Sequence, residues 1–194
     1  MENQEFSEQQ ALQLIEQTIK SVRQKVSENG FIFLLWGWFI LLGNVLSYLF
    51  ITLNISDAIG FCWMGIGVSG GIISFIYYAK KEKKMGSPSQ LEKYFTYIWS
   101  GVGLGAIALY TYFIIAEEYA LITPFVLTMA GIATFISGRM MKVSALVWGG
   151  ISFWIGTAAA LYFQSELQFL IGGACMVTGY LIPGYVLRSR YKKG

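Results

Sequence analysis

The chain has 194 residues, of which 55% are hydrophobic and 13% charged, with a mean hydropathy of +0.55 and a formal net charge of +3. Soluble globular domains carry about 25% charged residues, so this composition excludes an ordinary soluble domain and favours a single domain in lipid. The chain has no histidine and only two cysteines, which removes the commonest metal ligand, and we expect neither a metal site nor a cofactor.

Residues 1–29 are polar and Gln-rich, without the apolar core of a cleavable signal, so we expect the first span to act as an uncleaved insertion signal. Ser7 and Gln10 have the spacing of a helix capping box. Apolar residues at 3-4-3-4 spacing predict a cytoplasmic amphipathic helix with a narrow seam, formed by Leu12, Ile15, Ile19, Val22 and Val26.

This N-terminal segment carries five acids and three bases, whereas helices that lie on anionic lipid are normally basic. We therefore expect its seam to bind protein: the ends of the spans, a partner, or a second copy in a homo-oligomer. The alternative is an ordinary juxtamembrane helix without a partner.

Six long apolar runs follow, and they predict an all-α bundle of six transmembrane helices. The first has 23 residues without a charge, about 34 Å of helix, which is enough to cross a hydrocarbon core of about 30 Å. Ser89 and Glu92 form a second capping box at the start of the third span. The expected spans are 31–53, 59–79, 94–115, 119–138, 143–163 and 168–187.

The charges predict the orientation. All 14 Lys and Arg residues precede span one, follow span six, or lie between spans two and three or four and five. The opposite loops carry only acids: Asp57, Glu117, Glu118 and Glu166. By the positive-inside rule, both termini are cytoplasmic, and we expect the protein to be integral to the plasma (inner) membrane.

The basic side also predicts contacts. The loop between spans two and three and the C-terminal tail are expected to bind anionic lipid headgroups, at about 1 kcal/mol per base. The residues concerned are Lys80, Lys81, Lys83, Lys84, Arg188, Arg190, Lys192 and Lys193. No pattern in the chain points to nucleic acid.

Glycine and tryptophan recur in the spans. Trp36-Gly37, Trp99-Ser100-Gly101 and Trp148-Gly149-Gly150 begin odd-numbered spans at similar points, which suggests three repeated hairpins, although these residues are common in spans generally. Gly67 with Gly71 and Gly101 with Gly105 have GxxxG spacing. We expect these glycines to pack helices within the protein rather than to form a dedicated dimer motif.

Few residues at membrane depth carry chemistry. No charged residue lies in the central part of a span, which argues against ion pathways and proton relays. Asn44 is expected to connect helices, with a pore-lining role as the alternative. Pro183 and Gly184 interrupt span six and predict either a hinge or a kink.

Two segments, Leu34–Trp38 and Leu181–Tyr191, resemble a family of small bacterial six-span proteins with an N-terminal cytoplasmic helix. No activity is assigned to that family, so the resemblance implies no catalytic residues. Its members often lie beside small winged-helix regulators, which implies a signalling or stress-response setting. The three-hairpin plan is also similar to that of mitochondrial carriers, but their Pro-x-acid-x-x-base signature is missing from this chain.

These features favour a non-enzymatic scaffold or a regulatory or signalling subunit. The alternative is a small transporter or flippase-like protein for a neutral or amphipathic substrate. An enzyme is the least favoured class, because no constellation of catalytic residues occurs at membrane depth.

Overall fold

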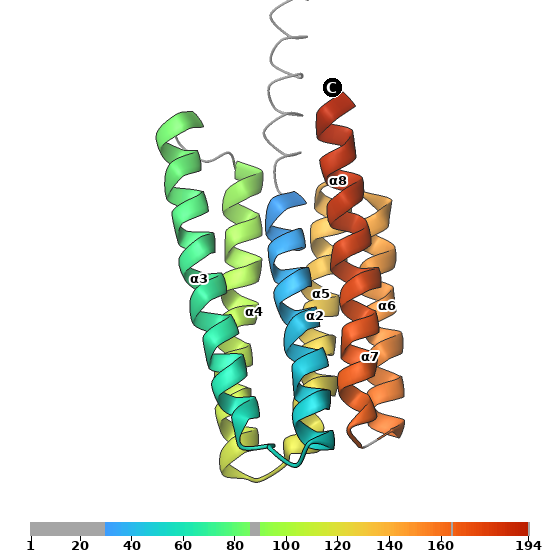
Figure 1. Cartoon of the computed structure of the whole chain (residues 1–194). Coiled ribbons are helices and arrows are strands. Elements are labelled where there is room, and N and C mark those ends of the chain that lie inside the picture. Colours follow the sequence, from blue (N-terminus) through green and yellow to red (C-terminus); the bar gives the residue numbers. More distant parts are fainter. Residues whose placement is uncertain (1–29, 86–89, 164, 194) are drawn as a thin grey trace, which may run out of the picture.

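Helices make up nearly all of the computed structural model, which describes residues 30–85, 90–163 and 165–193 (Figure 1). Six of its helical segments are long and apolar enough to span a bilayer, as expected, and the chain is a multi-pass membrane protein. The elements are α2 (Gly30–Thr52), α3 (Ala58–Met85), α4 (Gln90–Ile115), η1 (Tyr119–Leu121), α5 (Ile122–Met140), α6 (Ser144–Tyr162), α7 (Leu167–Met176), η2 (Val177–Leu181) and α8 (Ile182–Lys193).

The last three elements form one continuous span, Leu167–Tyr191. Several helices extend past the predicted apolar runs: α3 continues to Met85 and α8 to Lys193. Helical backbone satisfies its own hydrogen bonds, so a span continues into the headgroup region without cost even where charged residues replace apolar ones.

Successive spans run antiparallel, so the ends of the bundle differ. At one end α2 and α4 begin and α3, α5 and α8 finish (Figure 1). We call this the basic end, because it holds every Lys and Arg whose side chain is described. These are Lys80, Lys81, Lys83, Lys93, Arg139, Lys142, Arg188 and Arg190. The opposite end carries Asp57, Glu117, Glu118 and Glu166.

The predicted N-terminal helix, with its seam and its Ser7–Gln10 capping box, lies outside the described residues. Ser89 also lies outside them, although α4 begins at the next residue, Gln90.

Four spans form a closely packed core: α2, α5, α6 and the α7–η2–α8 span. The closest pair is α5 with α6, and α2 lies along α7, η2 and α8. The core is centred on side chains such as Leu127, Leu146 and Phe153, which are fully buried. Beside this core, α3 packs along α2 and α4 along α5, whereas α3 and α4 share few contacts with each other in the described part of the chain. The three hairpins of the predicted repeat are therefore unequal in their packing.

Three of the connecting turns end a helix in the same way. Asn54, Glu117 and Lys142 have φ angles of 58°, 59° and 54°, the left-handed conformation usual at the C′ position. In each turn the next residue donates its N–H to a carbonyl five residues back, as from Glu118 to Phe113 at 2.9 Å. Such turns reverse the chain tightly, and they keep consecutive spans antiparallel.

Glycine at such a position removes the strain that a Cβ imposes there, about 1 kcal/mol. We predict that Glu117→Gly raises the thermal unfolding midpoint in detergent. Glu118→Gly is the matched control, since it removes the same charge at a residue with φ of −90° and should leave the midpoint unchanged or lower it. Equal midpoints for the two variants would contradict the prediction.

Candidate functional site

Glycines join the helices of the core by letting their backbones approach. A Cβ added to Gly150 on α6 would lie 2.9 Å from the carbonyl oxygen of Gly131 on α5. A Cβ on Gly149 would lie 2.8 Å from the carbonyl oxygen of Gly179 in η2. Neither neighbour can move aside, because each is backbone. For these glycines the expectation of packing within the protein is confirmed.

The glycines of α3 and α4 behave differently. With one exception, an added Cβ would meet nothing within 4 Å. The exception is Gly70, which packs on the ring of Trp36. We call four of the others, which have GxxxG spacing, the hairpin glycines: Gly67, Gly71, Gly101 and Gly105. The expectation that they pack helices within the protein is wrong for the described chain, because no described helix comes close to their faces.

An ion pair ties α3 to α4 at the basic end. Lys81 Nζ lies 2.8 Å from Glu92 Oε1, and the two side chains are only 11% and 16% exposed. Gly71 lies ten residues from Lys81 along α3, and Gly101 lies nine residues from Glu92 along α4. At 1.5 Å per residue both glycines lie about 14–15 Å from the ion pair, near the middle of a core about 30 Å thick.

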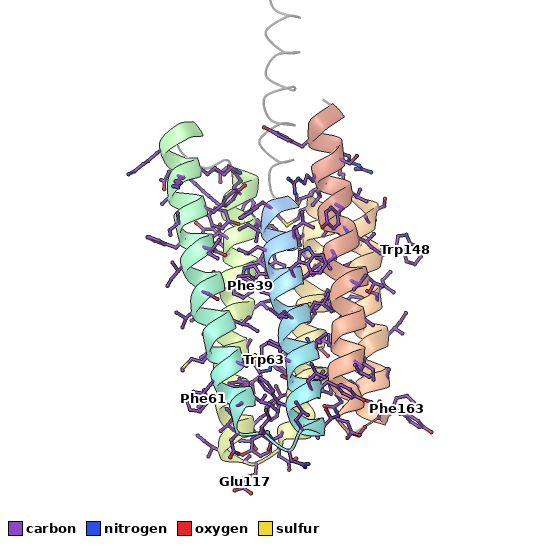
Figure 2. The ribbon with its side chains drawn as sticks, in the orientation of Figure 1. Phe39, Phe61, Trp63, Glu117, Trp148 and Phe163 are labelled. Atoms are coloured by element: carbon purple, nitrogen blue, oxygen red, sulfur yellow. The ribbon has the colours of Figure 1, made fainter. Side chains whose placement is uncertain are left out.

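Aromatic side chains attach α3 and α4 to the core. Trp63 of α3 packs on Gly43 and donates a hydrogen bond to Ser47 Oγ of α2 at 3.0 Å, and Figure 2 shows its ring between the two helices. At the basic end, Tyr77 of α3 stacks on Phe31 of α2 with ring centres 4.7 Å apart.

Several contacts of α4 converge on one aromatic cluster, formed by Phe33, Phe95, Trp99, Phe153 and Tyr180, while Phe113 packs on Phe125 of α5 nearer the opposite end. Tyr180 of η2 is 4% exposed, and its ring centre lies 5.8 Å from that of Phe33, 6.0 Å from Trp99 and 5.1 Å from Phe153. Phe95 lies 5.9 Å from Trp99 on the same helix, α4. Trp99 also donates to Ser137 Oγ of α5 at 3.3 Å. Rings from α2, α4, α6 and η2 thus meet around Tyr180.

Asn44 lies where α2 meets α7 and is 5% exposed. Its amide donates to the carbonyl of Ile40, one turn earlier in its own helix, at 2.8 Å. A Cβ added to Gly172 of α7 would lie 2.5 Å from Asn44 Oδ1. The amide side chain therefore occupies the space that the small residue on α7 leaves.

Gln168 was not singled out as a functional residue by the sequence analysis. It is buried in the first turn of α7, and its Nε2 donates to the carbonyls of Ala120 and Ala160, both at 2.9 Å. One amide thereby joins η1, α6 and α7 at the opposite end. The available signal was an uncharged amide at the first residue of a predicted span.

Hydroxyl groups add further links between core helices. Thr128 and Thr157 are hydrogen-bonded across α5 and α6 at 3.2 Å, and Ser152 and Thr178 across α6 and η2 at 3.0 Å.

Both cysteines are free. Cys62 lies on α3, and Cys175 is buried beside Gly156 of α6.

The described residues among those predicted to bind anionic lipid lie on two different helices. Lys80 and Lys83 are exposed on α3, and Arg188 and Arg190 are exposed on α8, whereas Lys81 is paired with Glu92. The side chains of Lys84, Lys192 and Lys193 lie outside the described residues.

The predicted interruption of span six coincides with a change of helix type. Pro183 is fully buried, and Gly184 packs on Leu34 of α2. The five residues Val177–Leu181 immediately before this point form a π-helix.

Comparison of the chain with known protein families, characterised proteins and solved structures yields no match. The resemblance to a bacterial six-span family stays a prediction.

Alanine substitution separates the two groups of glycines. We predict that Gly131→Ala and Gly149→Ala each destabilise the protein by about 1–3 kcal/mol, because the added methyl meets the Trp154 ring and the Gly150 carbonyl at Gly131 and the Gly179 backbone at Gly149. Gly67→Ala and Gly105→Ala should leave stability unchanged or raise it, because space is open and alanine favours helix. Thermal unfolding in detergent measures both effects; a loss at Gly67 as large as that at Gly131 would contradict the open face.

Proposed function

We propose that this protein is a non-enzymatic scaffold or regulatory subunit of a bacterial plasma membrane, with both termini in the cytoplasm. The observation that supports it is the contrast between packed core glycines and unpacked hairpin glycines. Lipid provides no hydrophobic drive for helix association, so small residues that admit close approach supply the packing. The hairpin glycines offer such faces to a transmembrane helix of another chain, either a partner or a second copy.

The basic end supplies a second kind of contact. Its described side chains include eight bases and only two acids, Glu82 and Glu92. Anionic headgroups are attracted to such a surface and would hold this end at the cytoplasmic leaflet. In this proposal the N-terminal seam, Leu12 to Val26, adds a cytoplasmic protein contact. The signalling setting implied by the family resemblance agrees with such a role.

A small transporter for a neutral or amphipathic substrate is the second candidate. The position of α3 and α4 favours it. These two helices share few contacts with each other and lie beside the closely packed core, and helices held by few contacts can move as a gate. Partner capture distinguishes the two candidates.

The first test is co-purification from native membranes in mild detergent. We predict that Gly67→Leu with Gly71→Leu abolishes recovery of a partner, or of a differently tagged second copy, while the monomer stays folded. Gly65→Leu is the control, since Gly65 is equally open but lies about 160° from Gly67 and about 120° from Gly71 around α3.

Removal of residues 1–29 tests the contribution of the N-terminal seam to the same complex. Failure to recover any partner or second copy with the native chain would contradict the scaffold role and leave the transporter as the better candidate.

Orientation is tested separately with fused reporters. Alkaline phosphatase, which is active only outside the cytoplasm, should be active when fused after Glu118 and inactive when fused after Arg190. The reason is that bases gather at the end that includes Arg190 and acids at the end that includes Glu118. The reverse pattern of activity would overturn the proposed topology.

A further inference from the structure

Two exposed aromatic side chains join α2 to α8 near the basic end. Trp38 of α2 donates its indole N–H to Tyr185 Oη of α8 at 3.3 Å, and the two side chains are 52% and 49% exposed. Side chains of a helix lean toward its N-terminus, and α2 and α8 run in opposite directions, so the two rings lean toward each other. The pair therefore bridges the two helices on their lipid-facing side.

The backbones of α2 and α8 lie close together beside this pair. A Cβ added to Gly30 of α2 would lie 3.0 Å from the carbonyl oxygen of Gly184, and a Cβ added to Gly184 would lie 2.9 Å from the side chain of Leu34. This close contact fixes the spacing between Trp38 and Tyr185. The two rings are thus presented by packed helices rather than by a loop, as a selective binding site requires.

The hydrogen bond leaves one donor of the pair unused. Tyr185 Oη accepts the indole N–H, and within the described part of the chain no group accepts the hydroxyl hydrogen of Tyr185. Tyrosine and tryptophan are enriched at the edge of the hydrocarbon core, where their polar tips meet the headgroup region. The lipid acceptors at that depth are the oxygens of the ester and phosphate groups.

Arg188 lies close to Tyr185 on the same helix. The two are three residues apart, which places Arg188 about 4.5 Å nearer the basic end and about 60° around α8. Its side chain is exposed and makes no ion pair with any residue that the structure describes. A guanidinium presents a planar fork of N–H donors that matches two oxygens of a phosphate group. The acids described at this end, Glu82 and Glu92, belong to α3 and α4, so the field around Arg188 favours an anion.

Exposed apolar side chains continue from the aromatic pair toward the middle of the membrane. Leu42 follows Trp38 by four residues, and Ile182 precedes Tyr185 by three, so each lies about one turn deeper on the same side of its helix. Both are exposed. From the basic end inward, the surface thus offers a cation, a hydroxyl donor and an apolar face. Phosphate, ester and acyl chain follow one another in the same order in a glycerophospholipid.

We propose that Arg188, Tyr185 and Trp38 form a binding site for one anionic glycerophospholipid of the leaflet at the basic end. Arg188 binds the phosphate, the Tyr185 hydroxyl donates to an ester carbonyl, and Trp38 orients that hydroxyl. The acyl chains lie along Leu42 and Ile182. This inference rests on the proposed attraction of anionic headgroups to the basic end, and it assigns one lipid to a defined site between two helices.

Native mass spectrometry of the full chain in detergent measures the affinity for added phosphatidylglycerol. Phosphatidylcholine is the control lipid, because it has the same phosphate and ester groups without the net charge. We expect the native chain to bind phosphatidylglycerol about tenfold more tightly than phosphatidylcholine. Inorganic phosphate in excess should not displace the bound lipid, since the site also holds the ester and the acyl chains.

Three variants locate the site. Arg188→Gln should weaken phosphatidylglycerol binding about tenfold or more, because a charge-assisted hydrogen bond is lost, and Tyr185→Phe about fivefold, the effect of one net hydrogen bond. Arg190→Gln is the matched control, with less than a twofold effect. It removes the same charge from an exposed residue of the same helix, but residue 190 lies about 140° from Tyr185 around α8.

The possible failures are distinguishable. Equal weakening by Arg188→Gln and Arg190→Gln would overturn the site, but the general attraction of anionic lipid to the basic end would stand. Equal affinity of the native chain for the two lipids would overturn both. Displacement of the lipid by inorganic phosphate would overturn the lipid assignment, because the site would then take a free anion.

Discussion

Close approach of backbones in lipid is the constraint on which this structure depends. Apolar side chains gain nothing by leaving hydrocarbon for one another, so helices in a membrane need geometry and dispersion rather than burial to associate. Gly131 against Gly150 and Gly149 against Gly179 supply that geometry for α5, α6 and η2. Removing the side chain from both partners brings many atoms of each backbone into contact, and this fixes the arrangement of the core.

Hydrogen bonds of polar side chains strengthen the packing between the same core helices. Thr128 and Thr157 each bond a carbonyl of their own helix, and the bond between the two hydroxyls adds a link that forms only in this arrangement of α5 and α6. Gln168 does the same at the end of the bundle by joining η1 to α6. In contrast, α3 and α4 are attached to the core by a few aromatic contacts and two tryptophan hydrogen bonds, and to each other by the Lys81–Glu92 ion pair. Most of their described surface is left to lipid or to another chain.

The sequence predicted the six spans well, because the thickness and polarity of the bilayer alone set the length and hydropathy that a spanning helix needs. The fourth span, expected to end at residue 138, ends at Met140, whereas the sixth continues beyond residue 187 because charged residues extend a helix into the headgroup region. Glycine spacing was less informative. Gly67-x-x-x-Gly71 and Gly149-Gly150 both define a small face, but spacing does not indicate whether another helix reaches it. Pro183 indicated a break, yet the π-helix before it packs on Gly149 and Phe153 of another helix, and no spacing in the sequence indicates those contacts.

Because α3 and α4 are packed less closely than the core helices, local opening of the structure should begin with them. Local opening is easiest where few buried contacts must be broken, and α3 and α4 are attached through a small number of side chains. One of these attachments, Trp99 on Tyr180, belongs to the irregular turn of the last span rather than to a regular helix face. The loosest pair of helices is therefore connected to the least regular backbone of the core. Trp99 also contacts Phe33 and donates to Ser137 Oγ, so at this point α4 is held by α2, α5 and η2 together.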